Sequence, residues 1–281
     1  MKKKIMKYSI IVLVVLLIGI YLYLENNILE VSIYEISSSK ISIQFDGYKI
    51  AQISDLHNTG SNKLKNSIIE SIKNEKPNII VITGDIVDSY KTNIESAIDF
   101  IKDINEIAPI YYVTGNHESR IDDYDVLMKK LEENKVIILD DRVEQITIDD
   151  SLINLIGIND PMCEHQSYLE DKEIVDGVIK KIEYNKDVFS ILLSHRPELF
   201  EIYHKYNFDL VFSGHAHGGQ IRLPFIGGLV APNQWLFPKY DGGLYEEDNT
   251  KMIVSRGIGN SILPFRINNN PELIYVTLKH K

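Results

Sequence analysis

Cysteine and tryptophan are nearly absent from this 281-residue chain, which contains one of each, Cys163 and Trp235. A single cysteine excludes an internal disulfide framework and any zinc site built mainly from cysteines. Basic residues are also scarce beyond the first segment: residues 1–24 carry four lysines and no acid, so 26 basic groups face 40 acidic groups in the remainder. This body, near −14 (26 − 40), lacks the basic surface that nucleic-acid binding requires, so we expect no nucleic-acid partner.

One long apolar run is present near the start, at residues 8–24, and it contains no charged side chain. As a helix it would extend roughly 25 Å, enough for a bilayer core with little tilt. The lysines before it predict a cytoplasmic N-terminus and an extracytoplasmic body. A cleaved signal peptide begins in the same way, but the run continues into YLYLENN instead of a small-residue cleavage site. We therefore expect an uncleaved, single-pass anchor in the cell membrane.

The rest of the chain alternates between strand-like and helix-like segments, which predicts an α/β fold with parallel strand pairs. Short β-branched runs indicate buried strands at 49–54, 78–83, 110–114, 135–139, 145–148, 152–156, 188–193, 210–213, 252–255 and 273–278. Apolar residues at helical spacing indicate helices at 62–74, 93–107, 125–134, 174–184 and 197–206. No repeat or later boundary is evident. We expect a tail and anchor at 1–24, a spacer with a first strand at 25–47, and one catalytic domain at 48–281.

Side chains that can bind metal ions follow five of the predicted strands. The five turns are D-L-H at 55–57, T-G-D at 83–85, G-N-H-E at 115–118, a lone His195, and G-H-A-H-G at 214–218. Any one of them is weak evidence, because Asp and His are common in loops. Together they hold five of the eight histidines of the chain, and strand ends are where open α/β sheets place their ligands. The sequence therefore predicts one metal site built from all five turns.

The donor types in these turns limit the chemistry of such a site. Asp, Asn and His supply oxygen and nitrogen ligands that suit Mn, Fe or Zn better than thiolate-preferring ions. Seven candidate ligands are too many for one tetrahedral ion but suit two ions that share a bridging carboxylate. Two such ions are the arrangement that stabilises attacking and leaving oxygens in phosphoryl displacement.

The ordered series D-x-H, G-D, G-N-H-E, H and G-H-A-H resembles the calcineurin-like metallophosphoesterase superfamily over about residues 48–220. The segments GHAHGGQIRLP and SRGIGNSILPFR extend the resemblance toward membrane-anchored bacterial phosphodiesterases with one N-terminal helix. The resemblance implies a four-layer α/β sandwich, in which two mixed β-sheets are flanked by helices.

The resemblance also implies a role for each motif residue. It assigns seven residues to two divalent metal ions: Asp55, His57 and His217 to the first, Asn116, His195 and His215 to the second, and Asp85 to both. His117 would lie over the leaving group as a general acid or a clamp on the phosphate, and Glu118 would orient it.

Residues outside the five motifs carry weaker functional predictions. We expect Arg196 and Arg256 as substrate contacts, because an arginine fork suits phosphate oxygens; a solvent-facing Arg196 is an equal alternative. Asp160 is expected to be structural or solvated. Trp235, with Leu236 and Phe237, could contact lipid or an acyl chain, although burial in the core is the favoured interpretation.

The leading hypothesis is a membrane-anchored, metal-dependent phosphoesterase, with a phosphodiester as the expected substrate and a hydroxide activated by two metal ions as the nucleophile. The substrate would be lipid-linked or associated with the envelope. Two alternatives stay open: a pyrophosphohydrolase acting on a lipid-nucleotide of the UDP-diacylglucosamine type, and a non-catalytic metal-binding module.

Overall fold

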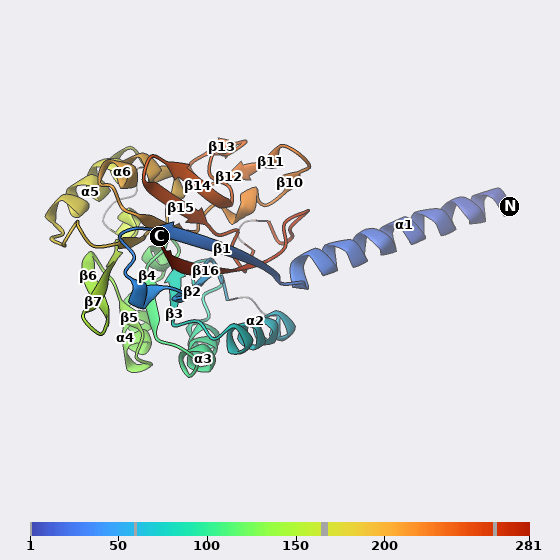
Figure 1. The fold of residues 1–281 in the computed structure, drawn as a ribbon. Helices are drawn as coiled ribbons and strands as arrows, with labels where there is room; N and C mark the ends of the chain where they lie inside the picture. Colours follow the sequence, from blue (N-terminus) through green and yellow to red (C-terminus); the bar gives the residue numbers. More distant parts are fainter. Residues whose placement is uncertain (1, 59–60, 164–167, 261–262) are drawn as a thin grey trace.

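Two six-stranded mixed sheets form the centre of the protein, which a computed structural model describes at residues 2–58, 61–163, 168–260 and 263–281 (Figure 1). The first sheet has the order β1 (Glu30–Ser38), β16 (Glu272–His280), β2 (Lys49–Ile53), β3 (Ile79–Thr83), β4 (Ile110–Val113) and β5 (Ile137–Ile138). The second has the order β14 (Gly243–Glu247), β15 (Thr250–Val254), β9 (Leu210–Ser213), β8 (Ser190–Leu193), β7 (Ser151–Gly157) and β6 (Arg142–Ile148). Strands β2 to β5 are mutually parallel, as are β7, β8, β9 and β15.

Alternation along the central strands separates the layers, because successive side chains of a strand point to opposite faces. On β3, Ile79 and Val81 lie in the core between the two sheets, whereas Ile80 and Ile82 pack under the helices. On β8, Ile191 faces the inter-sheet core and Leu192 faces the opposite side. All six side chains are buried, so these strands read as continuous apolar runs rather than as alternating ones.

Helices cover the outer faces of both sheets and complete the four layers (Figure 1). The first sheet is covered by α2 (Asn62–Glu75), α3 (Ile94–Asn105) and α4 (Tyr124–Glu133), and the second by α5 (Tyr168–Lys181) and α6 (Phe200–Lys205). Short 3₁₀ helices occupy Ile43–Phe45, Glu118–Arg120, Pro161–Cys163, Pro197–Leu199 and His217–Gly219. The predicted fold class is confirmed.

Helix α2 illustrates how local sequence sets these elements. Leu64, Ile68 and Ile72 recur every four residues and are its buried face. The Ser61 side chain accepts a hydrogen bond from the backbone of Leu64 and caps the first turn. The helix ends at Lys76, which adopts a left-handed conformation.

The N-terminal helix α1 (Lys2–Asn27) projects away from the sandwich (Figure 1). By length and composition it could cross a membrane, and none of its apolar window is buried in the protein. Its last turn is attached to the domain: Glu25 accepts a hydrogen bond from the backbone of Asn269, and Asn26 accepts one from the backbone of Arg266. After this turn, β1 pairs in parallel with β16 at the edge of the first sheet.

Two small hairpins follow the last ligand motif. They are formed by β10 (Arg222–Leu223) with β11 (Gly227–Gly228) and by β12 (Val230–Ala231) with β13 (Trp235–Leu236). The favoured burial of Trp235 is wrong, since its side chain is 81% exposed. The reason is its position: β13 pairs with β12 only, outside both large sheets.

Element boundaries differ from the predictions mainly at the sheet edges. The strand expected at 135–139 pairs over Ile137–Ile138 alone, because it is the edge strand of its sheet. The helix expected at 174–184 begins six residues earlier and ends at Lys181. Hydrophobic spacing locates the core of an element better than its ends.

Truncation of a side chain in the inter-sheet core should lower the free energy of unfolding much more than truncation of a surface side chain. Ile191→Ala removes a fully buried side chain and should lower the free energy of unfolding by about 2–5 kcal/mol through lost burial and a residual cavity. The matched control Ile43→Ala, at a position that is 62% exposed, should change it by less than about 0.5 kcal/mol. Urea unfolding of both variants followed by circular dichroism checks this. Equal losses in the two would contradict the assigned layers.

Candidate metal centre

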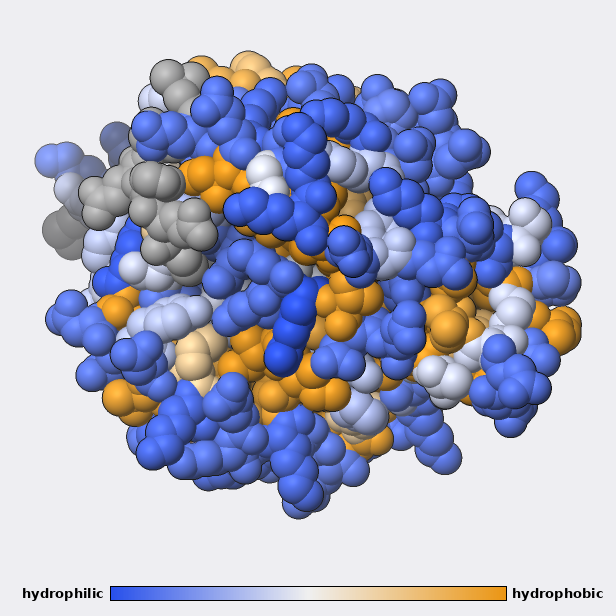
Figure 2. Space-filling view, turned by 90° about the vertical axis from the view of Figure 1, so that its left-hand side faces the viewer, coloured by the Kyte–Doolittle hydropathy of each residue, from blue (hydrophilic) through white to orange (hydrophobic). Residues whose placement is uncertain are grey.

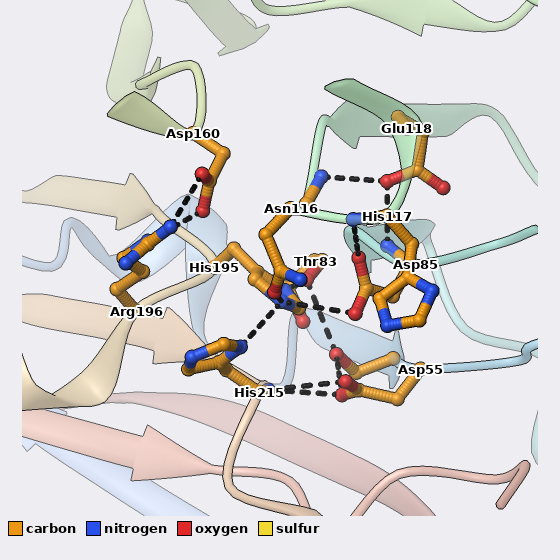
Figure 3. Close-up of polar contacts among 12 residues, drawn as sticks. Asp55, Thr83, Asp85, Asn116, His117, Glu118, Asp160, His195, Arg196 and His215 are labelled. Atoms are coloured by element: carbon orange, nitrogen blue, oxygen red, sulfur yellow. Dashed lines mark hydrogen bonds and ion pairs between the residues drawn. The ribbon is translucent and has the colours of Figure 1, made fainter. Parts of the chain in front are cut away.

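The carboxyl ends of five central strands meet at one edge of the sandwich and bring the motif side chains together (Figure 3). Asp55 follows β2, Asp85 follows β3, Asn116 follows β4, His195 follows β8 and His215 follows β9. All five are buried, as are His57 and His217. Seven residues from five separate turns therefore line one buried site.

One group of donor atoms is formed by Asp55, His57, Asp85 and His217. The Nε2 atoms of His57 and His217 lie 3.1 Å apart. His217 Nε2 is 3.2 Å from Asp55 Oδ1, and His57 Nε2 is 3.5 Å from Asp85 Oδ2.

A second group shares Asp85 and contains His195 and His215, with Asn116 beside it. His195 Nε2 lies 3.3 Å from Asp85 Oδ2, 3.2 Å from Asn116 Oδ1 and 3.1 Å from His215 Nδ1. Asp85 is thus common to both groups, as a bridging ligand would be.

The donor geometry fits metal ions at this centre. His195 Nδ1 donates a hydrogen bond to the carbonyl oxygen of Thr83 at 2.7 Å, so Nε2 of the neutral ring, the form that binds a metal ion, carries a lone pair directed into the site. That lone pair faces the acceptor oxygens of Asp85 and Asn116 (Figure 3). Ligands bonded to one ion at about 2.0–2.1 Å are separated by roughly 3 Å. The separations above match this spacing, and the residues present are able to hold two divalent ions.

Strained backbone conformations set the directions in which several of the proposed ligand side chains point. Asp55, His57, Asp85, His215 and His217 all have positive φ, between 44° and 65°. Such conformations cost about 1–3 kcal/mol each in a residue with a Cβ, and they concentrate at functional sites. The surrounding structure must therefore hold these turns in place.

Backbone amides and glycines provide that support. The amide of His117 donates to Asp85 Oδ1 at 2.8 Å, and the amide of His215 donates to Asp55. A Cβ at Gly115 would collide with the Asp85 carboxylate, and one at Gly214 would collide with Ser54 and Asp55. The glycines of these two motifs are needed because neighbouring turns approach each other closely.

Neighbouring charges shift the pKa values of the buried Asp85 and His195 in opposite directions. Burial alone would raise the pKa of Asp85, but nearby His195, and to a smaller extent His57, lower that pKa well below its ordinary value. Burial likewise opposes protonation of His195, yet Asp85 raises the pKa of this histidine to about 10. The carboxylates are thus held ionised by cationic neighbours, a role that bound dications also fill.

His117 differs from the other histidines in its orientation. Its Nδ1 accepts a hydrogen bond from the backbone amide of Ser89 at 3.0 Å, so the neutral ring carries its proton on Nε2. Burial lowers the pKa of His117 to about 4, which keeps the ring neutral near pH 7. The ring also lines the pocket above the metal ligands. His117 therefore offers an N–H donor to a molecule in that pocket.

Glu118 does not orient His117, contrary to the expectation from sequence. Its carboxylate accepts hydrogen bonds from the backbone amides of Gly115, Asp85 and Val87, at 2.7, 2.9 and 3.2 Å. Burial and then the charge of Asp85 raise its pKa to about 7. Glu118 ties together the turns that follow β3 and β4, and Ser89 orients the histidine.

Sequence reasoning missed four residues around the site. Ser89 is one; Asp88 places a carboxylate oxygen 3.5 Å from His57 Nδ1, where it can fix the orientation of that ring. Arg120 and Asn233 line a pocket of about 180 Å³ over the ligands. Asp88 and Ser89 lie within four residues of Asp85, and this proximity to a motif was the sequence signal that could have identified them. No such signal marks Asn233.

The two arginines expected as substrate contacts both form ion pairs with buried carboxylates. Arg196 is buried at the edge of the pocket, and its guanidinium pairs with both oxygens of Asp160 at 2.7 and 2.8 Å and with Asp171 at 2.7 Å. Asp160 is therefore structural, as expected. Arg256 pairs with Glu30 and Glu272, outside the pocket-lining residues. The arginine with an exposed side chain at the pocket is Arg120.

A two-sheet sandwich with a buried Asp, Asn and His cluster at its strand ends defines the class of metal-dependent hydrolases. Residues 48–219 match the family model described as calcineurin-like phosphoesterase. The chain belongs to the calcineurin-like phosphoesterase family and is a metal-dependent phosphoester hydrolase.

Relatives agree with this assignment over most of the chain. The uncharacterized metallophosphoesterase YkuE of Bacillus subtilis is 31% identical over 92% of this chain and 88% of its own length. A metallophosphoesterase of Aquifex aeolicus is 31% identical over 95% of this chain and 98% of its own. A transmembrane protein with a metallophosphoesterase domain from Danio rerio is 26% identical over 87% of this chain and 56% of its own. The crystal structure of TT1561 of Thermus thermophilus shares the fold, with a TM-score of 0.52, 11% identity, and coverage of 75% of this chain and 90% of that one.

The ion-pair cluster of Arg196 generates a prediction about stability. Arg196→Met leaves the Asp160 carboxylate buried without its cation, and should lower the free energy of unfolding by about 3–5 kcal/mol. Lys172→Met, which removes an exposed partner of Glu201, should change it by less than about 1 kcal/mol. Urea denaturation of both variants measures the difference. An Arg196→Met protein with wild-type stability and a raised KM would instead assign this arginine to substrate binding.

Proposed function

We propose that this protein is a membrane-anchored phosphodiesterase that uses two divalent metal ions, Mn, Fe or Zn, bridged by the Asp85 carboxylate. One observation carries the proposal: imidazole nitrogens lie 3.3 and 3.5 Å from the Asp85 carboxylate, and the imidazole nitrogens within each group lie 3.1 Å from one another. In this proposal seven residues hold the ions: Asp55, His57, Asp85 and His217 on one side, and Asn116, His195 and His215 with Asp85 on the other.

When bound, two divalent ions would neutralise the phosphate and lower the pKa of a water molecule to about 7. The residues of the chain supply the remaining functions. His117 is fixed by Ser89 with its Nε2–H at the pocket, where the neutral ring can donate a hydrogen bond to the departing oxygen and stabilise the charge that develops there. Arg120 lies at the pocket rim, three residues after His117, and is placed to contact a phosphate oxygen.

Membrane attachment is the second part of the proposal. Helix α1 has the length and composition to span a bilayer, and its last turn is hydrogen-bonded to the domain. The lysines at its start favour a cytoplasmic N-terminus, so in this proposal residues 48–281 lie outside the cytoplasm as the catalytic domain. A phosphoester in or near the envelope is the substrate that this location favours.

His117 provides the sharpest functional test. His117→Asn should lower kcat for an alkyl phosphodiester by roughly 10²–10³-fold, because the shorter asparagine does not reach the position of Nε2 and the departing oxygen loses its hydrogen-bond donor. For a nitrophenyl diester the loss should be smaller, since nitrophenolate delocalises its own charge. Steady-state kinetics with Mn, Zn and Fe supplied in turn measure both, and metal analysis should find the metal content unchanged.

His204→Asn is the matched control, because His204 lies on α6, pairs with Asp248 and is not among the pocket-lining residues. Loss of metal from His117→Asn would reassign His117 as a ligand. Failure of the wild-type protein to hydrolyse any phosphodiester with any of these metals would contradict the proposed activity. Faster release of a nucleoside monophosphate from a lipid-linked nucleotide would favour pyrophosphohydrolysis instead.

A further inference from the structure

The two hairpins after the last ligand motif expose large apolar side chains at their turns. Phe225 is fully exposed and Ile226 is 63% exposed at the β10–β11 turn, and β12–β13 exposes Trp235, Leu236 and Phe237. Contiguous exposed apolar groups of this size are uncommon on monomeric soluble proteins and mark surfaces that contact another phase or molecule.

The β10–β11 hairpin is connected to α1 through Asn268. The Tyr21 hydroxyl donates to Asn268 Oδ1 at 2.9 Å, and Asn268 Nδ2 donates to the backbone oxygen of Arg222 on β10. Asn268 lines one groove together with Phe225 and Ile226. The β10–β11 turn lies on the side of the domain from which α1 departs (Figure 1). The face turned away from α1 is mostly hydrophilic, with apolar residues in separate small areas (Figure 2).

The same hairpins border the metal centre. Pro232 and Asn233, in the turn between β12 and β13, line the pocket over the ligands. Asn233 also lies 3.4 Å from His215 Nε2 and donates to Glu198 at 2.9 Å, so this turn is fixed to the site. Trp235 follows two residues later.

We propose that the two hairpins form a second membrane contact, inserting Phe225, Ile226, Trp235, Leu236 and Phe237 into the surface of the bilayer that α1 crosses. The occupant is a lipid surface because the β10–β11 hairpin lies beside α1: Tyr21 is hydrogen-bonded to Asn268, which lines one groove with Phe225 and Ile226. Aromatic and aliphatic side chains on exposed hairpins, flanked by the exposed cation of Lys239, suit the headgroup boundary.

This contact would place the pocket mouth at the lipid interface. A phosphoester whose alcohol part is a lipid could then reach His117 without leaving the leaflet. This inference rests on the proposed anchorage through α1, and its test requires no catalytic activity.

Trp235 is the only tryptophan of the chain, so fluorescence of the full-length protein excited at wavelengths that tyrosine does not absorb reports on this hairpin alone. We would reconstitute the protein into phosphatidylcholine and phosphatidylglycerol vesicles with brominated acyl chains, and verify attachment by flotation. An inserted side chain lies about 5–10 Å into the boundary, where brominated chains should quench roughly half of the emission and aqueous iodide should quench little.

The matched control moves the fluorophore to the far side of the domain. In the double variant Trp235→Phe, Val126→Trp, the tryptophan is on α4 at a position that is 46% exposed. Its emission should be quenched by iodide and unaffected by brominated chains. A wild-type protein that floats with the vesicles but behaves like this control would overturn the hairpin contact alone. A protein that does not float would overturn both the anchorage and the contact.

Discussion

Two ionised carboxylates buried together, Asp55 and Asp85, set the conditions that the rest of the structure has to meet. Their exposed fractions are 0% and 1%, and a carboxylate removed from water is strongly destabilising unless cations or hydrogen bonds compensate it. Backbone amides of His117 and His215 supply part of the compensation. The imidazoles supply the rest only if they are protonated, as the raised pKa of His195 indicates. Divalent ions remove that need, which is why metal binding in such a site is accompanied by proton release.

The sandwich architecture makes this concentration of charge possible. Strands β2, β3 and β4 of one sheet and β8 and β9 of the other end at the same edge, so ligands come from turns on both sheets. The inter-sheet core under them, with Val81 and Ile191 fully buried, holds the turns in conformations that a free peptide would avoid. Rigidity here contributes directly to chemistry, because metal ligands and a proton donor act only within narrow distance limits.

Sequence patterns predicted the α/β alternation and the five turns that hold all seven proposed ligands, since buried strands and the motifs at their ends leave local signatures. The family resemblance implied the four layers and the assignment of each ligand. Neither could predict partners that become neighbours only through folding. Arg196 was expected to contact phosphate, but its guanidinium neutralises the buried carboxylate of Asp160, which lies 36 residues earlier in the chain. Trp235 looked like a core residue because composition does not reveal that its strand pairs with one short neighbour. The role of Glu118 was misassigned for the same reason, as its three amide donors lie on two separate turns.

The central claim is that Asp85 bridges two metal ions, and electron paramagnetic resonance during titration of the metal-free, full-length protein with Mn²⁺ tests it most directly. The account predicts that the signal of free Mn²⁺ stays suppressed until two equivalents have bound, and that the bound ions give an exchange-coupled spectrum. Two ions about 3.5–4 Å apart with a shared carboxylate are coupled in this way. Saturation at one equivalent, or two ions with uncoupled spectra, would contradict the shared-carboxylate centre.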